Sequence, residues 1–154
     1  MIEQDLKTLY RCLEEYKDFD KDPANCEKFL ATVDAIVVQK NPESIPILFQ
    51  YLDDKSEYSW VMEELMLALE YYETLGFLKE LAKNALWYWH ISPLRTQILI
   101  CRIINSPADF KELKNFISTF SIPDSFFKIL SDSVKLSQSP HHAELLKELQ
   151  RKLK

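Results

Sequence analysis

Three carboxylates in the middle of the chain have the spacing of a metal-binding motif. Asp53, Asp54 and Glu57 form the pattern DDxxE, and isoprenoid synthases use such carboxylates to hold Mg²⁺ through a diphosphate group. Those enzymes are longer all-helical chains with a second acidic motif that faces the first, and this 154-residue sequence contains no such second motif. We therefore expect neither a metal site nor a cofactor, and we keep a small Mg²⁺-dependent enzyme only as a minor alternative.

Other residue combinations that support catalysis are incomplete in this sequence. The pair Glu70 and Glu73 resembles the ExxE motif of all-helical nucleotide pyrophosphatases, but the later ExxD motif of those enzymes is missing. His141 and His142 open the last expected helix, where we expect both rings to be exposed near the helix cap. Neither a Ser/His/Asp nor a Cys/His constellation can be assembled with any specificity. The sequence thus predicts a protein that is not an enzyme.

The single glycine, Gly76, limits which folds and which glycine-dependent motifs the chain can contain. A GxGxxG turn, a P-loop and a GxSxG elbow each need at least two glycines. With 47% hydrophobic and 28% charged residues, the chain fits one globular domain over residues 1–154. The three cysteines are widely spaced and odd in number, which favours reduced thiols. We expect a soluble, cytoplasmic protein without a signal peptide or membrane span.

Prolines mark the starts of helices along the whole chain. Five of them follow a residue that caps helices well, in the pairs Asp22-Pro23, Asn41-Pro42, Ser92-Pro93, Ser106-Pro107 and Ser139-Pro140. Between these pairs, apolar residues recur at helical spacing. The expected helices include segments at about 43–52, 56–72, 74–89, 107–119, 124–137 and 140–153.

These patterns predict an all-α fold of about nine helices. The connections are short, so we expect antiparallel helical hairpins, stacked in a HEAT-like α-solenoid or an irregular bundle. Thr74 is the expected cap of its helix. The segment from Ile98 to Ile104 is apolar nearly all round, which predicts a central position in the fold.

Charge is divided unevenly along the chain. Residues 1–80 contain 18 acidic and 8 basic side chains, whereas residues 81–154 contain 6 acidic and 11 basic ones. The densest acidic stretch lies between Tyr51 and Glu73, where a single Lys55 accompanies the acids. Such a field speeds association with a basic partner and repels nucleic acid.

The same stretch contains a second helical stripe. Trp60, Glu64, Leu67 and Tyr71 share one face, which differs from the apolar core face of the same helix. Core packing of the two aromatic rings is the slightly favoured interpretation, and an exposed docking surface is the alternative. The candidate partner-binding residues are Asp53, Asp54, Glu57, Trp60, Glu63, Glu64, Glu70 and Tyr71.

Arg102 interrupts an otherwise apolar run. A buried guanidinium needs a carboxylate or carbonyl partner. We therefore predict that Arg102 is buried and forms a structural ion pair between the acidic and basic halves of the chain.

Two ordered elements resemble a bacterial family of immunity proteins. The first runs through residues 51–58 (YLDDKSEY), 61–63 (VME) and 69–70 (LE), and is similar to the family pattern DD…E(F/Y)…VM…(I/L)E. The second, at 102–106 (RIINS), is similar to R-(I/V)-L-N-S. Together they cover about residues 45–120. The family, numbered thirty, protects cells from polymorphic toxins, including those of contact-dependent growth inhibition systems.

This resemblance implies a HEAT-like, all-α, non-enzymatic protein that binds and neutralises the C-terminal domain of a cognate toxin. Many such toxins are nucleases with basic clefts, which an acidic and aromatic surface could occupy. We expect a monomer alone, a 1:1 heterodimer with the toxin, and no nucleic acid or membrane partner. The alternative is a helical adaptor module with a protein partner other than a toxin.

Overall fold

The computed structural model describes residues 5–151. Contacts group the chain into two compact units, one ending at Tyr72 and the other starting at Glu73, and each is described by itself. The described residues form ten helices and no strand, which confirms the all-α prediction. The HEAT-like stack and the single domain stay predictions.

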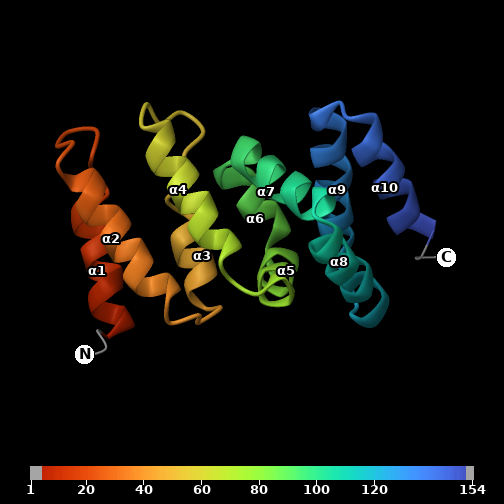
Figure 1. Ribbon diagram of the computed structural model, residues 1–154, viewed down its shortest axis with the longest axis horizontal. Coiled ribbons are helices and arrows are strands. Elements are labelled where there is room, and N and C mark those ends of the chain that lie inside the picture. The colour runs from red at the N-terminus through yellow and green to blue at the C-terminus, as the bar shows by residue number, and fades with distance from the viewer. Residues whose placement is uncertain (1–4, 152–154) are drawn as a thin grey trace. The chain divides into compact units, whose positions relative to one another are not determined.

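The first unit is built from α1 (Leu6–Tyr16), α2 (Asn25–Val37), α3 (Ser44–Phe49) and α4 (Ser59–Glu70). In Figure 1, α1 and α2 are antiparallel neighbours, and α3 contacts both α2 and α4. Apolar side chains at helical spacing fill the space between them. The most buried include Leu13, Phe29, Ile36, Leu48, Phe49, Leu65 and Met66.

Helix α4 contributes one continuous apolar stripe to this core. The sequence predicted the stripe from its i, i+3 and i+4 spacing, and the structure confirms it. Its members are Val61, Met62, Leu65, Met66 and Leu69, all almost completely buried. The helix is shorter than expected, because residues 56–58 form a turn in which the Tyr58 N–H donates to Ser56 Oγ at 3.1 Å.

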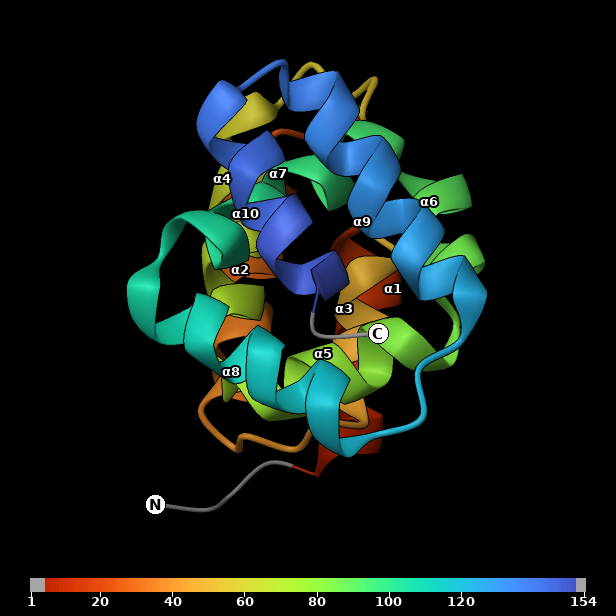
Figure 2. The same ribbon diagram turned by 90° about the vertical axis from the view of Figure 1, so that its right-hand side faces the viewer.

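The second unit contains six helices, and four of them pack against α7. They are α5 (Thr74–Lys83), α6 (Ala85–Ile91), α7 (Pro93–Asn105), α8 (Pro107–Thr119), α9 (Asp124–Ser137) and α10 (Pro140–Arg151). Helix α7 contacts α6, α8, α9 and α10, so the prediction that its apolar run is central is confirmed. Figure 2 shows α9 and α10 side by side, joined by a short turn.

The helix expected over residues 74–89 is two helices. Asn84 has φ −141° and ψ 47°, outside the helical region, and it ends α5 and precedes α6. Asparagine competes with helical backbone bonds through its own side chain, which makes it a natural break point. The capping role expected of Thr74 is wrong as well. Thr74 is the first residue of α5, and its hydroxyl donates to Asp109 Oδ1 at 2.7 Å, which joins α5 to α8.

Three of the five proline pairs open helices as predicted. Helices α7, α8 and α10 begin at their prolines, after Ser92, Ser106 and Ser139. At the other two pairs the helix starts two residues after the proline, because the side chain before the proline forms a local turn. Asp22 accepts the N–H of Ala24 at 3.1 Å, and Asn41 accepts the N–H of Glu43 at 3.0 Å.

Left-handed backbone occurs at residues other than glycine. Lys40 has φ 51° and Gln138 has φ 53°, and each precedes one of the capping residues before a proline. Gly76 lies within α5 instead, at a helical position that does not need its freedom.

Candidate functional site

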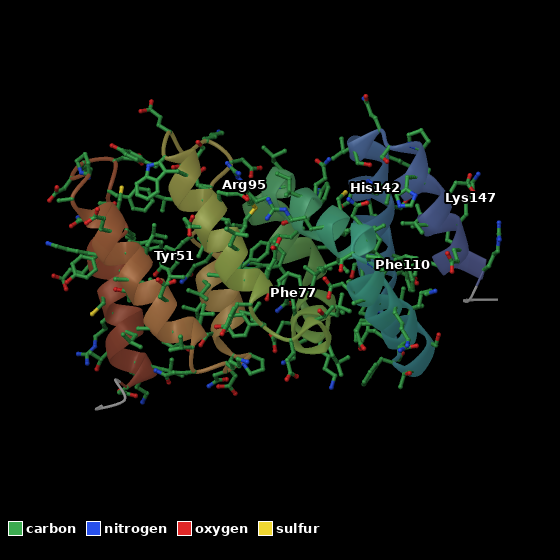
Figure 3. All side chains as sticks on the ribbon, in the orientation of Figure 1. Tyr51, Phe77, Arg95, Phe110, His142 and Lys147 are labelled. Carbon is green, nitrogen blue, oxygen red and sulfur yellow. The ribbon has the colours of Figure 1, made fainter. Side chains whose placement is uncertain are left out.

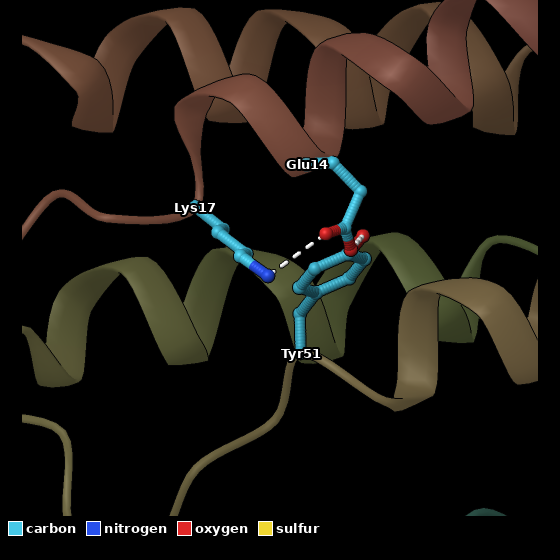
Figure 4. Close-up of polar contacts among 3 residues, drawn as sticks. All are labelled: Glu14, Lys17 and Tyr51. Carbon is cyan, nitrogen blue, oxygen red and sulfur yellow. Dashed lines mark hydrogen bonds and ion pairs between the residues drawn. The ribbon is translucent and has the colours of Figure 1, made fainter.

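The acidic segment begins at a residue tied to the first helix. The Tyr51 hydroxyl donates to Glu14 Oε1 at 2.5 Å, and Lys17 Nζ lies 2.8 Å from the other carboxylate oxygen of Glu14 (Figure 4). These hydrogen bonds lower the pKa of Glu14, whereas burial, helped by Glu14, raises the pKa of Tyr51. The Tyr51 ring packs edge-on against Phe29, with the ring centres 5.5 Å apart. The start of the acidic segment is therefore held on α1 and α2.

A tight turn leads from Tyr51 into α4. The Asp53 carboxylate accepts the backbone N–H of Lys55 at 2.9 Å, and the side chain of Leu52 is buried. Asp53 and Glu57 are exposed on this turn. The turn therefore presents both exposed carboxylates in the segment just before α4.

The second stripe of α4 faces outward. Trp60, Leu67 and Tyr71 are 50%, 47% and 59% exposed, and Glu64 is exposed beside them. The favoured prediction that Trp60 and Tyr71 pack into the core is therefore wrong. The apolar stripe of α4 already faces its neighbours in the first unit, and these residues lie on a different face of the helix.

We call Asp53, Glu57, Trp60, Glu64, Leu67 and Tyr71 the α4 surface. Asp54, Glu63 and Glu70, the remaining predicted partner-binding residues, each already interact with another residue. Asp54 and Glu63 are also half-buried. The α4 surface therefore contains five of the eight predicted partner-binding residues, together with Leu67, and all six are exposed.

Sequence reasoning missed Lys40 as a neighbour of this surface. Its Nζ lies 5.3 Å from the centre of the Tyr71 ring, a cation–π contact. The contact brings the turn after α2 next to the end of α4. Nothing in the local sequence around Lys40 indicated this pairing, because it depends on the packing of α2 against α4.

The DDxxE carboxylates do not form a metal site in the structure. Within residues 5–151, no group of three or more His, Cys, Asp or Glu side chains is placed to hold a metal ion. The Asp53 carboxylate bonds the chain's own backbone instead. The minor alternative of a Mg²⁺-dependent enzyme therefore gains no support.

A second polar region lies in the unit that begins at Glu73. A cleft of about 310 Å³ is lined by Gln97, Ile98, Cys101, Arg102, Asn105, Ser137 and His142. Arg102 lies on the wall of this cleft and is half-buried, not fully buried as the sequence predicted. Helix α7 turns one side toward the cleft, although its segment from Ile98 to Ile104 is apolar nearly all round. The predicted ion pair between the two halves of the chain stays a prediction.

The two histidines of α10 differ. His141 is exposed as expected, whereas His142 is half-buried near the turn between α9 and α10 (Figure 3). The backbone N–H of His142 donates to Ser139 Oγ at 3.3 Å, and its ring Nδ1 lies 3.1 Å from Ser137 Oγ. Burial and the neighbouring His141 lower the pKa of His142. The ring is therefore part of the packed turn rather than a free cap.

The charge division follows the two units. The chain up to Tyr72 contains 16 acidic and 7 basic side chains, and the chain from Glu73 contains 8 acidic and 12 basic ones. The acidic α4 surface belongs to the acidic unit.

No helix among residues 5–151 combines the length and the apolar character needed to cross a bilayer.

Comparison with known proteins identifies a family. The family described as Immunity protein 30 matches residues 10–113, from within α1 to within α8. The match includes the whole α4 surface and Arg102, and it starts closer to the N-terminus than the residues 45–120 of the sequence resemblance. Searches of curated proteins and of solved structures found no match. More than half of the chain fits the family, and the chain therefore belongs to the Immunity protein 30 family.

Proposed function

We propose that this immunity protein neutralises a cognate toxin domain by binding it through the α4 surface. The observation that supports this most is the half-exposed row of Trp60, Leu67 and Tyr71 on one helix face. Large aromatic side chains inside a charged rim are the usual anchors of protein interfaces. Because these rings are exposed in the free protein, a partner that covers them gains the free energy of burying apolar area.

The charges of the α4 surface favour a basic partner. Asp53, Glu57 and Glu64 are exposed, and they belong to the more acidic of the two units. Many toxins that such proteins inhibit are nucleases whose clefts bind phosphate. In such a cleft these carboxylates would take the places of phosphate groups, and the toxin's own cations would pair with them. Close charge pairs across such an interface contribute about 1.5–7 kcal/mol of coupling energy.

The partner is, in this proposal, the C-terminal domain of a polymorphic toxin of the contact-dependent growth inhibition type. Binding takes place in the cytoplasm and forms a 1:1 heterodimer from a monomeric immunity protein. The immunity protein performs no reaction itself, and it uses neither nucleic acid nor membrane as a partner. Inhibition follows from occupation of the toxin's surface.

Alanine substitution of the two anchors tests the surface directly. Trp60→Ala and Tyr71→Ala should each weaken toxin binding by about 30-fold, equivalent to about 2 kcal/mol for an interface anchor. Both side chains are about half exposed, so the free energy of unfolding should change by less than about 1 kcal/mol. Affinity is measured by calorimetry, and unfolding by urea titration.

The matched control is Trp87→Ala. Trp87 is another partly exposed tryptophan, 40% exposed on α6, outside the α4 surface. This change should leave toxin affinity within about twofold. Equal losses for Trp60→Ala and Trp87→Ala, or none for either, would place the interface elsewhere. In a second experiment, the toxin domain is expressed in cells together with the unaltered protein, and growth is measured. Death of these cells would reject the immunity function against that toxin.

A further inference from the structure

The α7–α10 cleft, defined by the seven lining residues given above, is an open recess with a mostly polar lining. Its volume of about 310 Å³ is at the lower end of the range for small-molecule sites. Five of its seven lining residues are polar or charged, and none is acidic. The unit that holds the cleft contains 8 acidic and 12 basic side chains, so a lining without carboxylates agrees with its net positive charge.

Helix α7 supplies most of the wall through its spacing. Gln97, Cys101 and Asn105 lie four residues apart, and Ile98 and Arg102 follow the same interval. Residues four apart share a helix face, so their side chains converge on one side of α7. Burial raises the pKa of the Cys101 thiol, and its Sγ lies 3.8 Å from the backbone oxygen of Ser133. Cys101 is therefore a protonated wall residue rather than a nucleophile.

The opposite wall is held by a chain of hydrogen bonds. The Ser137 hydroxyl donates to the backbone oxygen of Val134 at 2.7 Å, and its Oγ lies 3.1 Å from His142 Nδ1. The backbone N–H of Ser139 also reaches Ser137 Oγ, at 3.3 Å. Because these hydrogen bonds hold the turn between α9 and α10 in place, this wall needs little reordering when a ligand enters.

The donors on α7 select the ligand's chemistry. Arg102 has five N–H donors in a planar fork that matches the two oxygens of a carboxylate or a phosphate group. Arg102 already interacts with another residue, and five donors leave capacity for a ligand. The amides of Gln97 and Asn105 each add an NH₂ group that can donate to the same anion. None of the seven lining residues is a carboxylate that could pair with a cationic ligand.

We infer that the α7–α10 cleft binds a small oxyanion, a carboxylate or a phosphate group, with Arg102 as the charged contact and the amides of Gln97 and Asn105 as further donors. This site lies in the unit that begins at Glu73, whereas the α4 surface lies in the other unit. The inference is independent of the proposed toxin binding.

NMR titration with inorganic phosphate, and separately with acetate, tests the site in the full chain. Saturable shifts should appear at the side-chain N–H groups of Arg102 and at the amides of Gln97 and Asn105. Arg102→Gln should weaken binding of the tighter anion by about 10-fold, as expected for loss of one charge-assisted contact. Tighter binding of phosphate would identify a phosphate site, and tighter binding of acetate a carboxylate site.

Lys111→Gln is the matched control, because it removes one positive charge from an exposed position on α8. It should change the affinity by less than about twofold. Asn105→Leu provides a second variant at an exposed rim position, where folding should tolerate the change, and it should weaken binding about threefold. Shifts that do not saturate, or equal losses with Lys111→Gln and Arg102→Gln, would overturn the inference.

Discussion

One buried hydroxyl in α9 has no hydrogen-bond partner among the described residues. Ser133 is fully buried, and its Oγ atom is left unsatisfied. An unpaired buried polar group costs about 1–3 kcal/mol, so Ser133→Ala should raise the free energy of unfolding by about 1 kcal/mol. Ser131→Ala, at a half-buried position of the same helix, should give only the smaller gain from helix propensity. Urea unfolding measures the free energy of unfolding of both variants. Equal increases would show that the unpaired Ser133 hydroxyl does not destabilise the protein.

Two buried tyrosines make stability sensitive to alkaline pH. Burial raises the pKa of Tyr72 to about 12 and raises that of Tyr88 as well. Above pH 10 the unfolded chain loses these protons while the folded protein keeps them, so stability falls as pH rises. Each tyrosine contributes a slope of up to about 1.4 kcal/mol per pH unit.

Urea unfolding between about pH 9 and 11 measures this slope. Tyr88→Phe should reduce the slope by one tyrosine's share, because no proton is left to lose at that position. A Tyr88→Phe protein with the original slope would contradict the assignment.

Residue types alone predicted the core better than the surface. The apolar stripe of α4 followed from spacing, because one apolar face must be buried wherever the helix packs. The exposure of Trp60 and Tyr71 did not follow, since a second stripe is exposed or buried according to how many neighbours the helix has. Arg102 was expected to be fully buried because the run around it is apolar nearly all round.

At the scale of elements, the left-handed end of α9 offers a stabilising change. Gln138 has φ 53°, a conformation that costs a residue with a Cβ atom about 1–2 kcal/mol. Gln138→Gly removes this cost but adds freedom to the unfolded chain, so a net gain of about 0.5–1 kcal/mol is expected. Lys135→Gly, inside the last turn of α9, should instead destabilise by about 1 kcal/mol. Thermal unfolding measures the melting temperature of both variants. A lower melting temperature for Gln138→Gly than for the unaltered protein would contradict the expected cost of the left-handed conformation.

Most element boundaries followed from proline and apolar periodicity. The misplaced starts at Asp22 and Asn41 have a common physical reason, because both side chains bond the backbone two residues later and delay the helix. The break at Asn84 lies inside a helical apolar pattern, and a single asparagine is too weak a signal to place it. Long-range packing decides whether such a residue interrupts the helix.

At the scale of the whole molecule, charge reversal separates local recognition from net charge. Asp53→Lys, Glu57→Lys and Glu64→Lys together should slow toxin association at least about 10-fold at low salt, and the difference should shrink at high salt. Stopped-flow measurement at two salt concentrations gives both quantities.

The control reverses three exposed acids of the same unit that lie outside the α4 surface. These are Glu15, Asp18 and Asp20. Because both triple variants change the net charge equally, a purely long-range effect would slow association to the same extent in both. Equal rates would therefore reject a local role for the α4 surface.

The family was predictable because its two motifs retain their order and interval along the chain. The sequence also indicated the charge division, which the structure relates to two compact units. The α7–α10 cleft was not predictable, since it needs α7 and the turn before α10 to meet. Residues that far apart in sequence give no joint signal in a single chain.

The position of the tryptophans has a practical consequence. Trp60 is the one tryptophan before Glu73 in the sequence, and Trp87 and Trp89 follow in the other unit. An indole that is half exposed to water emits at longer wavelength than one covered by apolar groups. In a protein in which Trp87 and Trp89 are replaced by phenylalanine, all tryptophan fluorescence comes from Trp60. Its emission wavelength then reports, without an added label, whether the α4 surface is exposed to water or covered.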